Sequence, residues 1–69
     1  MLHNIVQTTS STATLLIVDD DRDIRQLIAD SLGARGYRVE TAANAREMDA
    51  VLARIPVDLI ILDVMMPGE

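Results

Sequence analysis

The chain has 69 residues, of which 49% are hydrophobic and 25% are charged, as expected for one small soluble domain. The formal net charge is −5, and the 6 cationic side chains are all arginines that form no cluster, which excludes an electrostatic footprint for nucleic acid in this segment. Phe, Trp and Cys are absent, so the core is aliphatic, and neither a disulfide framework nor a thiolate metal site is available.

Residues 1–13 are rich in Thr, Ser and Asn and show no sustained periodicity, which predicts a flexible leader. His3 lies within it, and we interpret this residue as a solvated side chain and not as a ligand. The segment lacks the basic and long apolar regions of a secretory signal, and no apolar run approaches the roughly 18 residues that span a bilayer. The sequence therefore predicts a cytoplasmic protein without membrane contact.

The first strand is predicted at residues 15–18, a continuous apolar run followed by aspartates and typical of a strand that is buried on both faces. A helix then begins at Asp21 or Arg22. Its apolar positions follow helical spacing, with Ile24, Leu27, Ile28 and Leu32 on one face. The sequence GARG ends the helix, because Gly33 or Gly36 can adopt the left-handed conformation of a helix C-terminus.

A second strand is predicted at residues 37–41, where YRVET alternates between apolar and polar side chains. Asn44 and Glu47 have the spacing of an N-cap and a capping box, so a second helix follows. Its apolar face consists of Met48, Val51, Leu52 and Ile55. Pro56 ends this helix, and residues 57–62 form a third apolar strand that is again followed by an aspartate, Asp63.

The predicted order is βαβαβ, an α/β fold in which helices connect strands that must run parallel. We expect three layers, with the sheet in strand order 2-1-3 if the third strand lies beside the first. Parallel strands place their carboxyl ends at one edge of the sheet. Asp19, Asp20 and Asp63 would therefore meet in the crevice where open α/β sheets bind ligands.

Converging carboxylates repel one another by about 4 kcal/mol per pair at a separation of about 4 Å and an effective dielectric constant near 20. Either they become protonated or a hard cation binds, and an all-oxygen cluster suits Mg²⁺, or Mn²⁺, better than zinc. A cation beside a partly exposed carboxylate also gives Asp63 a chemical role. It could attack phosphorus while the metal neutralises the phosphoryl oxygens, which forms an aspartyl phosphate.

Three segments resemble the receiver domain of two-component response regulators, in register over residues 14–69: LLIVDDDRDIRQLI, GYRVETA and PVDLIILDVMMPGE. The resemblance implies a flavodoxin-like fold. It also implies that Asp19 and Asp20 are the acidic pair that holds Mg²⁺, with Asp20 as the direct ligand and Asp19 acting partly through water. Asp63 matches the phospho-acceptor, and Met65 matches the position whose backbone carbonyl completes the metal site.

The function that the resemblance implies is a phosphorylation switch. A sensor histidine kinase would supply the phosphoryl group to Asp63, so we expect a phosphoacceptor that supports its own phosphoryl transfer and not a dedicated enzyme. Pro67 and Gly68 match the turn after the phosphorylation site. The sequence MMPGE is similar to regulators with a winged-helix output, which predicts transcription control with DNA contact only through an output domain outside this chain.

Receivers continue through two further strands that supply a Thr or Ser hydroxyl and a Lys to the acyl phosphate, whereas this chain contains no Lys. We therefore expect residues 14–69 to be the amino-terminal portion of a receiver domain, truncated after the third strand. Its third strand would then present an unpaired apolar edge, open to dimerisation or to strand pairing. The alternative function is a receiver-like interaction fragment that lacks the switch residues and is not phosphorylated.

Other interpretations of the acidic residues explain less of the sequence. DDDRD could serve only as a turn and a helix N-cap, but an aspartate at a second strand end favours a site. The same stretch places acidic residues at EF-hand loop positions, namely Asp19, Asp21, Asp23 and Asp30. Ile24, however, stands where that loop needs Gly. A haloacid-dehalogenase-like phosphatase needs a second Asp two residues after Asp63, where this chain has Met65.

Overall fold

The structure is a computed structural model that describes residues 12–62, so the predicted leader and the segment from Asp63 onward lie outside the described residues, apart from positions 12 and 13. Its elements follow the predicted order and are β1 (Thr14–Val18), α2 (Arg22–Ala34), β2 (Arg38–Ala42), α3 (Ala45–Arg54) and β3 (Leu59–Leu62). None of the helices within residues 12–62 is long and apolar enough to cross a membrane.

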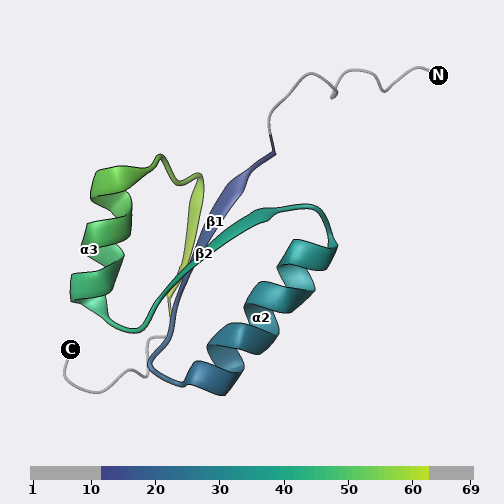
Figure 1. The fold of residues 1–69 in the computed structure, drawn as a ribbon, viewed down its shortest axis with the longest axis horizontal. Helices are drawn as coiled ribbons and strands as arrows, with labels where there is room; N and C mark the ends of the chain where they lie inside the picture. Colours follow the sequence, from purple (N-terminus) through teal and green to yellow (C-terminus); the bar gives the residue numbers. More distant parts are fainter. Residues whose placement is uncertain (1–11, 63–69) are drawn as a thin grey trace.

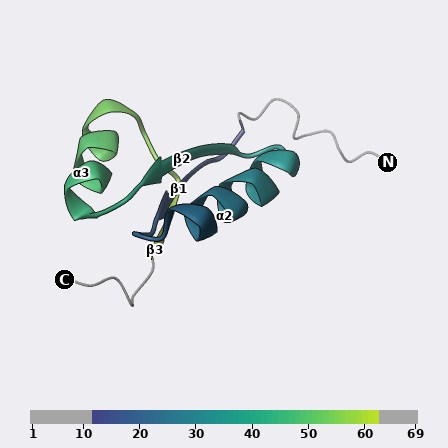
Figure 2. The same ribbon diagram turned by 60° about the horizontal axis from the view of Figure 1, so that its bottom comes forward.

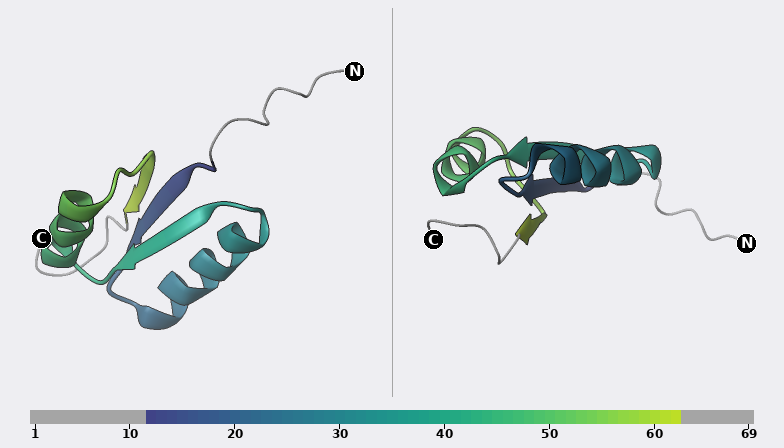
Figure 3. Two further views of the ribbon diagram at one scale, coloured as in Figure 1. Left: turned by 45° about the horizontal axis from the view of Figure 1, so that its top comes forward. Right: turned by 90° about the horizontal axis from the view of Figure 1, so that it is seen from below.

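The three strands form one parallel sheet in the order β2-β1-β3, which confirms the predicted topology. Figure 3 shows the arrowheads of all three strands pointing the same way, with β1 between its two neighbours. In the register of the sheet, Leu16 of β1 pairs with Glu40 of β2 and with Ile60 of β3. The carboxyl ends of the strands therefore lie at one edge.

The two helices lie on opposite sides of the sheet, as the three-layer prediction requires (Figures 1 and 2). The core between the sheet and α3 contains buried aliphatic side chains from β1, β2 and α3, and half-buried residues pack around it. The buried members are Leu16, Val18, Ala42 and Val51, and the half-buried ones are Met48, Ile55 and Val57. The core is aliphatic because the sequence contains no Phe or Trp.

Both helices begin at side-chain caps that the sequence predicts. The Asp21 carboxylate accepts the backbone N–H groups of Asp23 and Ile24 at 3.0 and 3.1 Å. The Asn44 side chain accepts the Glu47 N–H at 2.9 Å. Glu47 in turn accepts from the N–H of Ala43 at 2.8 Å, one residue before the position that a standard capping box uses.

The strand starts differ from the prediction by one or two residues. The second strand begins at Arg38 and not at residue 37, because the Tyr37 N–H donates to the Leu32 carbonyl at the end of α2, at 3.3 Å. The third begins at Leu59 and not at residue 57, because Asp58 hydrogen-bonds to the start of β1 outside the regular strand ladder. Gly33 lies inside α2, whereas Gly36 has the left-handed φ of 98°.

Burial is uneven across the fold. Every residue of β1 is buried, as expected for a strand with neighbours on both edges and helices on both faces. In β3, by contrast, Leu59 and Leu62 are 55% and 50% exposed. The predicted apolar face of α2 is only partly covered, because Ile24 and Leu27 are exposed while Ile28 and Leu32 are half-buried.

Candidate functional site

Asp19 lies at the carboxyl end of β1 and is held in place by its surroundings. It is buried, and its backbone N–H donates to the Ala42 carbonyl at 3.1 Å, which continues the pairing of β1 with β2 by one residue. One of its carboxylate oxygens, Oδ1, accepts the N–H of Asp21 at 2.8 Å. The other oxygen accepts no hydrogen bond from within residues 12–62, so it could bind a cation directly or through water.

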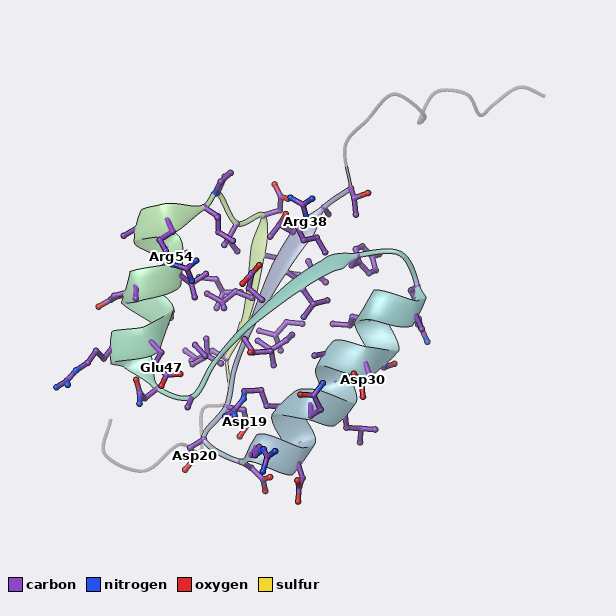
Figure 4. The ribbon with its side chains drawn as sticks, viewed as in Figure 1. Asp19, Asp20, Asp30, Arg38, Glu47 and Arg54 are labelled. Atoms are coloured by element: carbon purple, nitrogen blue, oxygen red, sulfur yellow. The ribbon has the colours of Figure 1, made fainter. Side chains whose placement is uncertain are left out.

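Asp20 differs from both of its acidic neighbours. Its side chain is exposed, and within the part of the chain that the structure describes no hydrogen bond engages its carboxylate. Figure 4 shows Asp19 and Asp20 together where β1 turns toward α2. Asp21 is occupied as the N-cap of that helix. Among the described residues, the consecutive aspartates therefore have three different roles: Asp19 fixes the turn, Asp20 presents an exposed carboxylate, and Asp21 caps the helix.

Arg25 connects the acidic turn to α2. Its guanidinium Nη1 donates to the backbone carbonyl of Asp19 at 2.9 Å, in a half-buried position six residues along the chain. The apolar face of the predicted helix does not include this side chain, so its spacing in the sequence indicates only a polar position. The bond spans the turn between strand and helix, so helical periodicity alone could not reveal it.

The remaining predicted site residues, Asp63 and Met65, lie outside the described residues. The structure does place the strand that leads to them. Leu62 pairs with Val18 in the parallel register, so β3 ends directly beside the residue that precedes Asp19. The chain therefore reaches position 63 from the same edge of the sheet at which Asp19 and Asp20 lie.

The donor set is that of a hard cation. Asp19 and Asp20 offer carboxylate oxygens, and neither cysteine nor histidine lies near them in the sequence. Within residues 12–62 no third acidic or histidine side chain joins these two, and no enclosed pocket forms around them. An open, all-oxygen edge suits Mg²⁺, which keeps several of its waters and uses only one or two protein carboxylates.

A parallel sheet of order 2-1-3, with helices on both faces and acidic residues at its carboxyl edge, defines a doubly wound α/β domain of the flavodoxin-like kind. The family model of the response regulator receiver domain matches residues 15–69, and the chain belongs to this family. The resemblance seen in the sequence is thereby confirmed.

Individual relatives agree with this assignment. The probable transcriptional regulator ycf27 of Cyanidium caldarium is 49% identical over 53 residues, which are 77% of this chain and 21% of that protein. The transcriptional regulatory protein AruR of Pseudomonas aeruginosa is 43% identical over 60 residues, which are 80% of this chain and 25% of that protein.

Among solved structures, the chemotaxis response regulator CheY4 of Vibrio cholerae is similar to the chain with a TM-score of 0.78 and 44% sequence identity. The match covers 86% of this chain and 49% of that one. The chain thus spans about a quarter or less of the length of the two regulators and about half of the structure.

Proposed function

We propose that this chain is the phosphoacceptor part of a response regulator, in which Asp63 takes a phosphoryl group from a sensor histidine kinase with the help of Mg²⁺. The observation that carries the proposal is the register of the sheet. This register ends β3 at Leu62 directly beside Val18, so Asp63 follows one strand in the sequence and Asp19 and Asp20 follow the other. Asp19 is fixed by its hydrogen bonds, and Asp20 is exposed and has no hydrogen bond to its carboxylate within residues 12–62.

The proposed reaction is a displacement at phosphorus. A carboxylate oxygen of Asp63 forms the new bond to phosphorus while the bond from phosphorus to the donor histidine nitrogen breaks, and its electron pair returns to the imidazole, which takes up a proton. Asp19, Asp20, Asp63 and the backbone carbonyl of Met65 would hold the ion, whose charge neutralises the phosphoryl oxygens when it is bound. Asp20 suits direct coordination because its carboxylate is exposed and carries no competing bond within the described residues.

The wider setting belongs to the same proposal. Relatives with the names of transcriptional regulators support an output that controls transcription, with DNA contacted by a region outside this chain. We place the protein in the cytoplasm, where a kinase and DNA are both accessible. The chain itself acts as a phosphoacceptor and not as a dedicated enzyme, since Asp63 is consumed as the acceptor in each phosphorylation.

The proposal is tested by exposing the protein, as its gene encodes it, to Mg²⁺ and acetyl phosphate and measuring its intact mass. We expect one added phosphoryl group that is absent in Asp63→Asn and absent when EDTA removes the metal. Asp20→Asn should also abolish or strongly slow the reaction. Asp21→Asn is the matched control, because Asn caps a helix as well as Asp does and this residue is occupied as a cap.

A wild-type protein that gains no phosphoryl mass would contradict the proposal and favour the second candidate, a receiver-like module that only binds partners. The observation behind that candidate is β3, which pairs with β1 alone among residues 12–62 and leaves Leu59 and Leu62 half exposed. Such a strand can pair with another chain or with a second copy. Self-association that rises with concentration and is unaffected by Mg²⁺ would distinguish it.

A further inference from the structure

Asp58 lies in the connection between α3 and β3, where it is joined to the first residue of β1 by two reciprocal hydrogen bonds. The backbone N–H of Thr14 donates to Asp58 Oδ2 at 2.7 Å, and the N–H of Asp58 donates to the Thr14 carbonyl at 2.8 Å. Both backbone polar groups of a buried residue are thus satisfied by one partner 44 positions away. A carboxylate acceptor makes the first of these bonds charge-assisted and short.

This pair sits at the end of the sheet opposite the acidic edge. Thr14 pairs with Arg38 in the register of β1 and β2, and Figure 4 shows Arg38 far from Asp19 and Asp20 along the strands. Asp58 directly precedes Leu59, the first residue of β3. The reciprocal bonds therefore lie where β3 first meets β1. Along the chain they precede all the residue pairs between the two strands, from Leu15 with Leu59 to Val18 with Leu62.

The apolar side chains of the two strands do not by themselves select one register. β1 reads TLLIV and β3 reads LIIL, so a shift of either strand still sets aliphatic residues against aliphatic residues on both faces. Register is specified strongly only where the two faces of a strand differ. The hydrogen bond from the Thr14 N–H to Asp58 is directional and can form in one register only, so it selects the register that the side chains of the two strands do not select.

We infer that Asp58 is a positioning residue for the acidic edge, because its bonds to Thr14 fix the register of β3 against β1. The inference rests on the proposed function, since it explains how the end of β3 at Leu62 is held beside Val18, the residue before Asp19. A parallel strand advances about 3.3 Å per residue, so a slip of two residues moves the end of β3 by about 6.6 Å. Mg²⁺ accepts ligands at about 2.0–2.1 Å and cannot bridge such a displacement.

The test compares three variants of the protein as its gene encodes it. Asp58→Ala removes the acceptor of the Thr14 N–H. Asp58→Asn retains a side-chain oxygen in the same place and should rescue. Asn44→Ala is the control for stability, because it removes the cap of α3 without touching either strand.

The readouts are the dissociation constant for Mg²⁺ by calorimetry and the rate of phosphorylation by acetyl phosphate. We expect Asp58→Ala to weaken Mg²⁺ binding by about 10-fold or more, the size typical of a lost residue that supports metal ligands, while Asp58→Asn and Asn44→Ala stay close to the wild type. If Asp58→Ala does not fold, Asp58→Glu takes its place, since the added methylene displaces the carboxylate but keeps its charge. The same loss of Mg²⁺ binding is then expected.

Equal Mg²⁺ affinities in Asp58→Ala, or in Asp58→Glu where that variant replaces it, and in Asn44→Ala would overturn the inference and leave Asp58 with a role in stability alone. Failure of the wild type to bind Mg²⁺ or accept a phosphoryl group would instead overturn the proposed function. In that case the register itself is measured by NMR, from proton contacts between the paired residues Leu15 and Leu59. Their retention in Asp58→Ala, or in Asp58→Glu where that variant replaces it, would contradict the register role independently of any metal.

Discussion

β1 and β3 are built from the same kind of residue, yet they lie in different environments. Both are short aliphatic runs followed by an aspartate in the sequence. β1 is buried along its whole length, whereas three of the four residues of β3 are exposed. The two strands even form register pairs, so Leu16, which is 0% exposed, lies beside Ile60, which is 39% exposed.

The difference comes from neighbours and not from composition. β1 has a hydrogen-bonded strand on each edge and a helix on each face, while β3, among residues 12–62, is paired on one edge only. Each apolar side chain is stabilised in proportion to the area that neighbours remove from water. An apolar run therefore shows that a strand is able to be buried, and the elements around it decide how much of that burial takes place.

The largest expected effect of shortening a side chain is found in the register pair of Leu16 and Ile60. Leu16→Ala removes a fully buried side chain and should destabilise the fold by about 2–5 kcal/mol, which is enough to unfold a small domain. Ile60→Ala removes a side chain that already contacts water, so we expect a loss of about 1–2 kcal/mol. Urea titration followed by circular dichroism measures both values.

Equal losses of unfolding free energy in Leu16→Ala and Ile60→Ala would contradict the difference between β1 and β3, because they would mean that Ile60 is as well covered as Leu16. A larger loss for Leu16→Ala, with an unchanged slope against urea, would support it. Ile60→Val is a useful control for side-chain shape, since it keeps the branched geometry that suits a strand and removes only one methyl group.

The next effect concerns the connection that brings β2 alongside β1. Gly36 has a φ of 98°, which an alanine adopts only with strain, so Gly36→Ala should destabilise the fold by about 1–2 kcal/mol. Gly33 lies within α2 and has open space where a Cβ would stand. Gly33→Ala should therefore stabilise the fold by about 0.5–1 kcal/mol.

Thermal melts of the two glycine variants measure this difference as shifts of opposite sign. A destabilised Gly33→Ala would mean that the end of α2 is not helical in solution. An unchanged Gly36→Ala would mean that the turn before β2 tolerates a right-handed backbone. Either result would count against the conformation of the connection between α2 and β2, which places β2 along one edge of β1.

Local patterns in the sequence were sufficient for the element order, the helix caps and the position of Asp19 and Asp20 at the carboxyl end of β1. Asp21 and Asn44 act on N–H groups within three residues of themselves, so their spacing in the sequence reveals them. The strand order 2-1-3 depended on the condition that the third strand lies beside the first, which the resemblance to receiver domains implies and the sheet confirms. The fold class and the receiver family could therefore be predicted from the sequence.

Features that depend on distant partners could not be predicted in this way. The starts of β2 and β3 are set by the bonds of Tyr37 to Leu32 and of Asp58 to Thr14, and the second of these joins residues 44 positions apart. Leu27 is 68% exposed although it belongs to the apolar face of α2, because periodicity shows only which face could be covered.

The smallest effect on stability is expected at the start of β3. This prediction tests the difference in burial between β1 and β3 most directly. Leu59 is paired with the buried Leu15 but is itself 55% exposed. Leu59→Lys should change the free energy of unfolding by no more than about 0.5 kcal/mol, because the ammonium group can reach water while the aliphatic stem covers the same surface. Leu15→Lys, its matched partner, should abolish folding, since it places a charge among buried side chains.

Self-association separates the two ways in which Leu59→Lys could be tolerated. A lysine on an exposed strand opposes edge-to-edge pairing, so a chain that associates through β3 should become more monomeric in sedimentation velocity experiments. If β3 contacts no other chain, the sedimentation of the variant and of the wild type should be the same. If Leu59→Lys unfolds as Leu15→Lys does, Leu59 must be covered as completely as Leu15 in solution, and the contrast between the two strands would then be wrong.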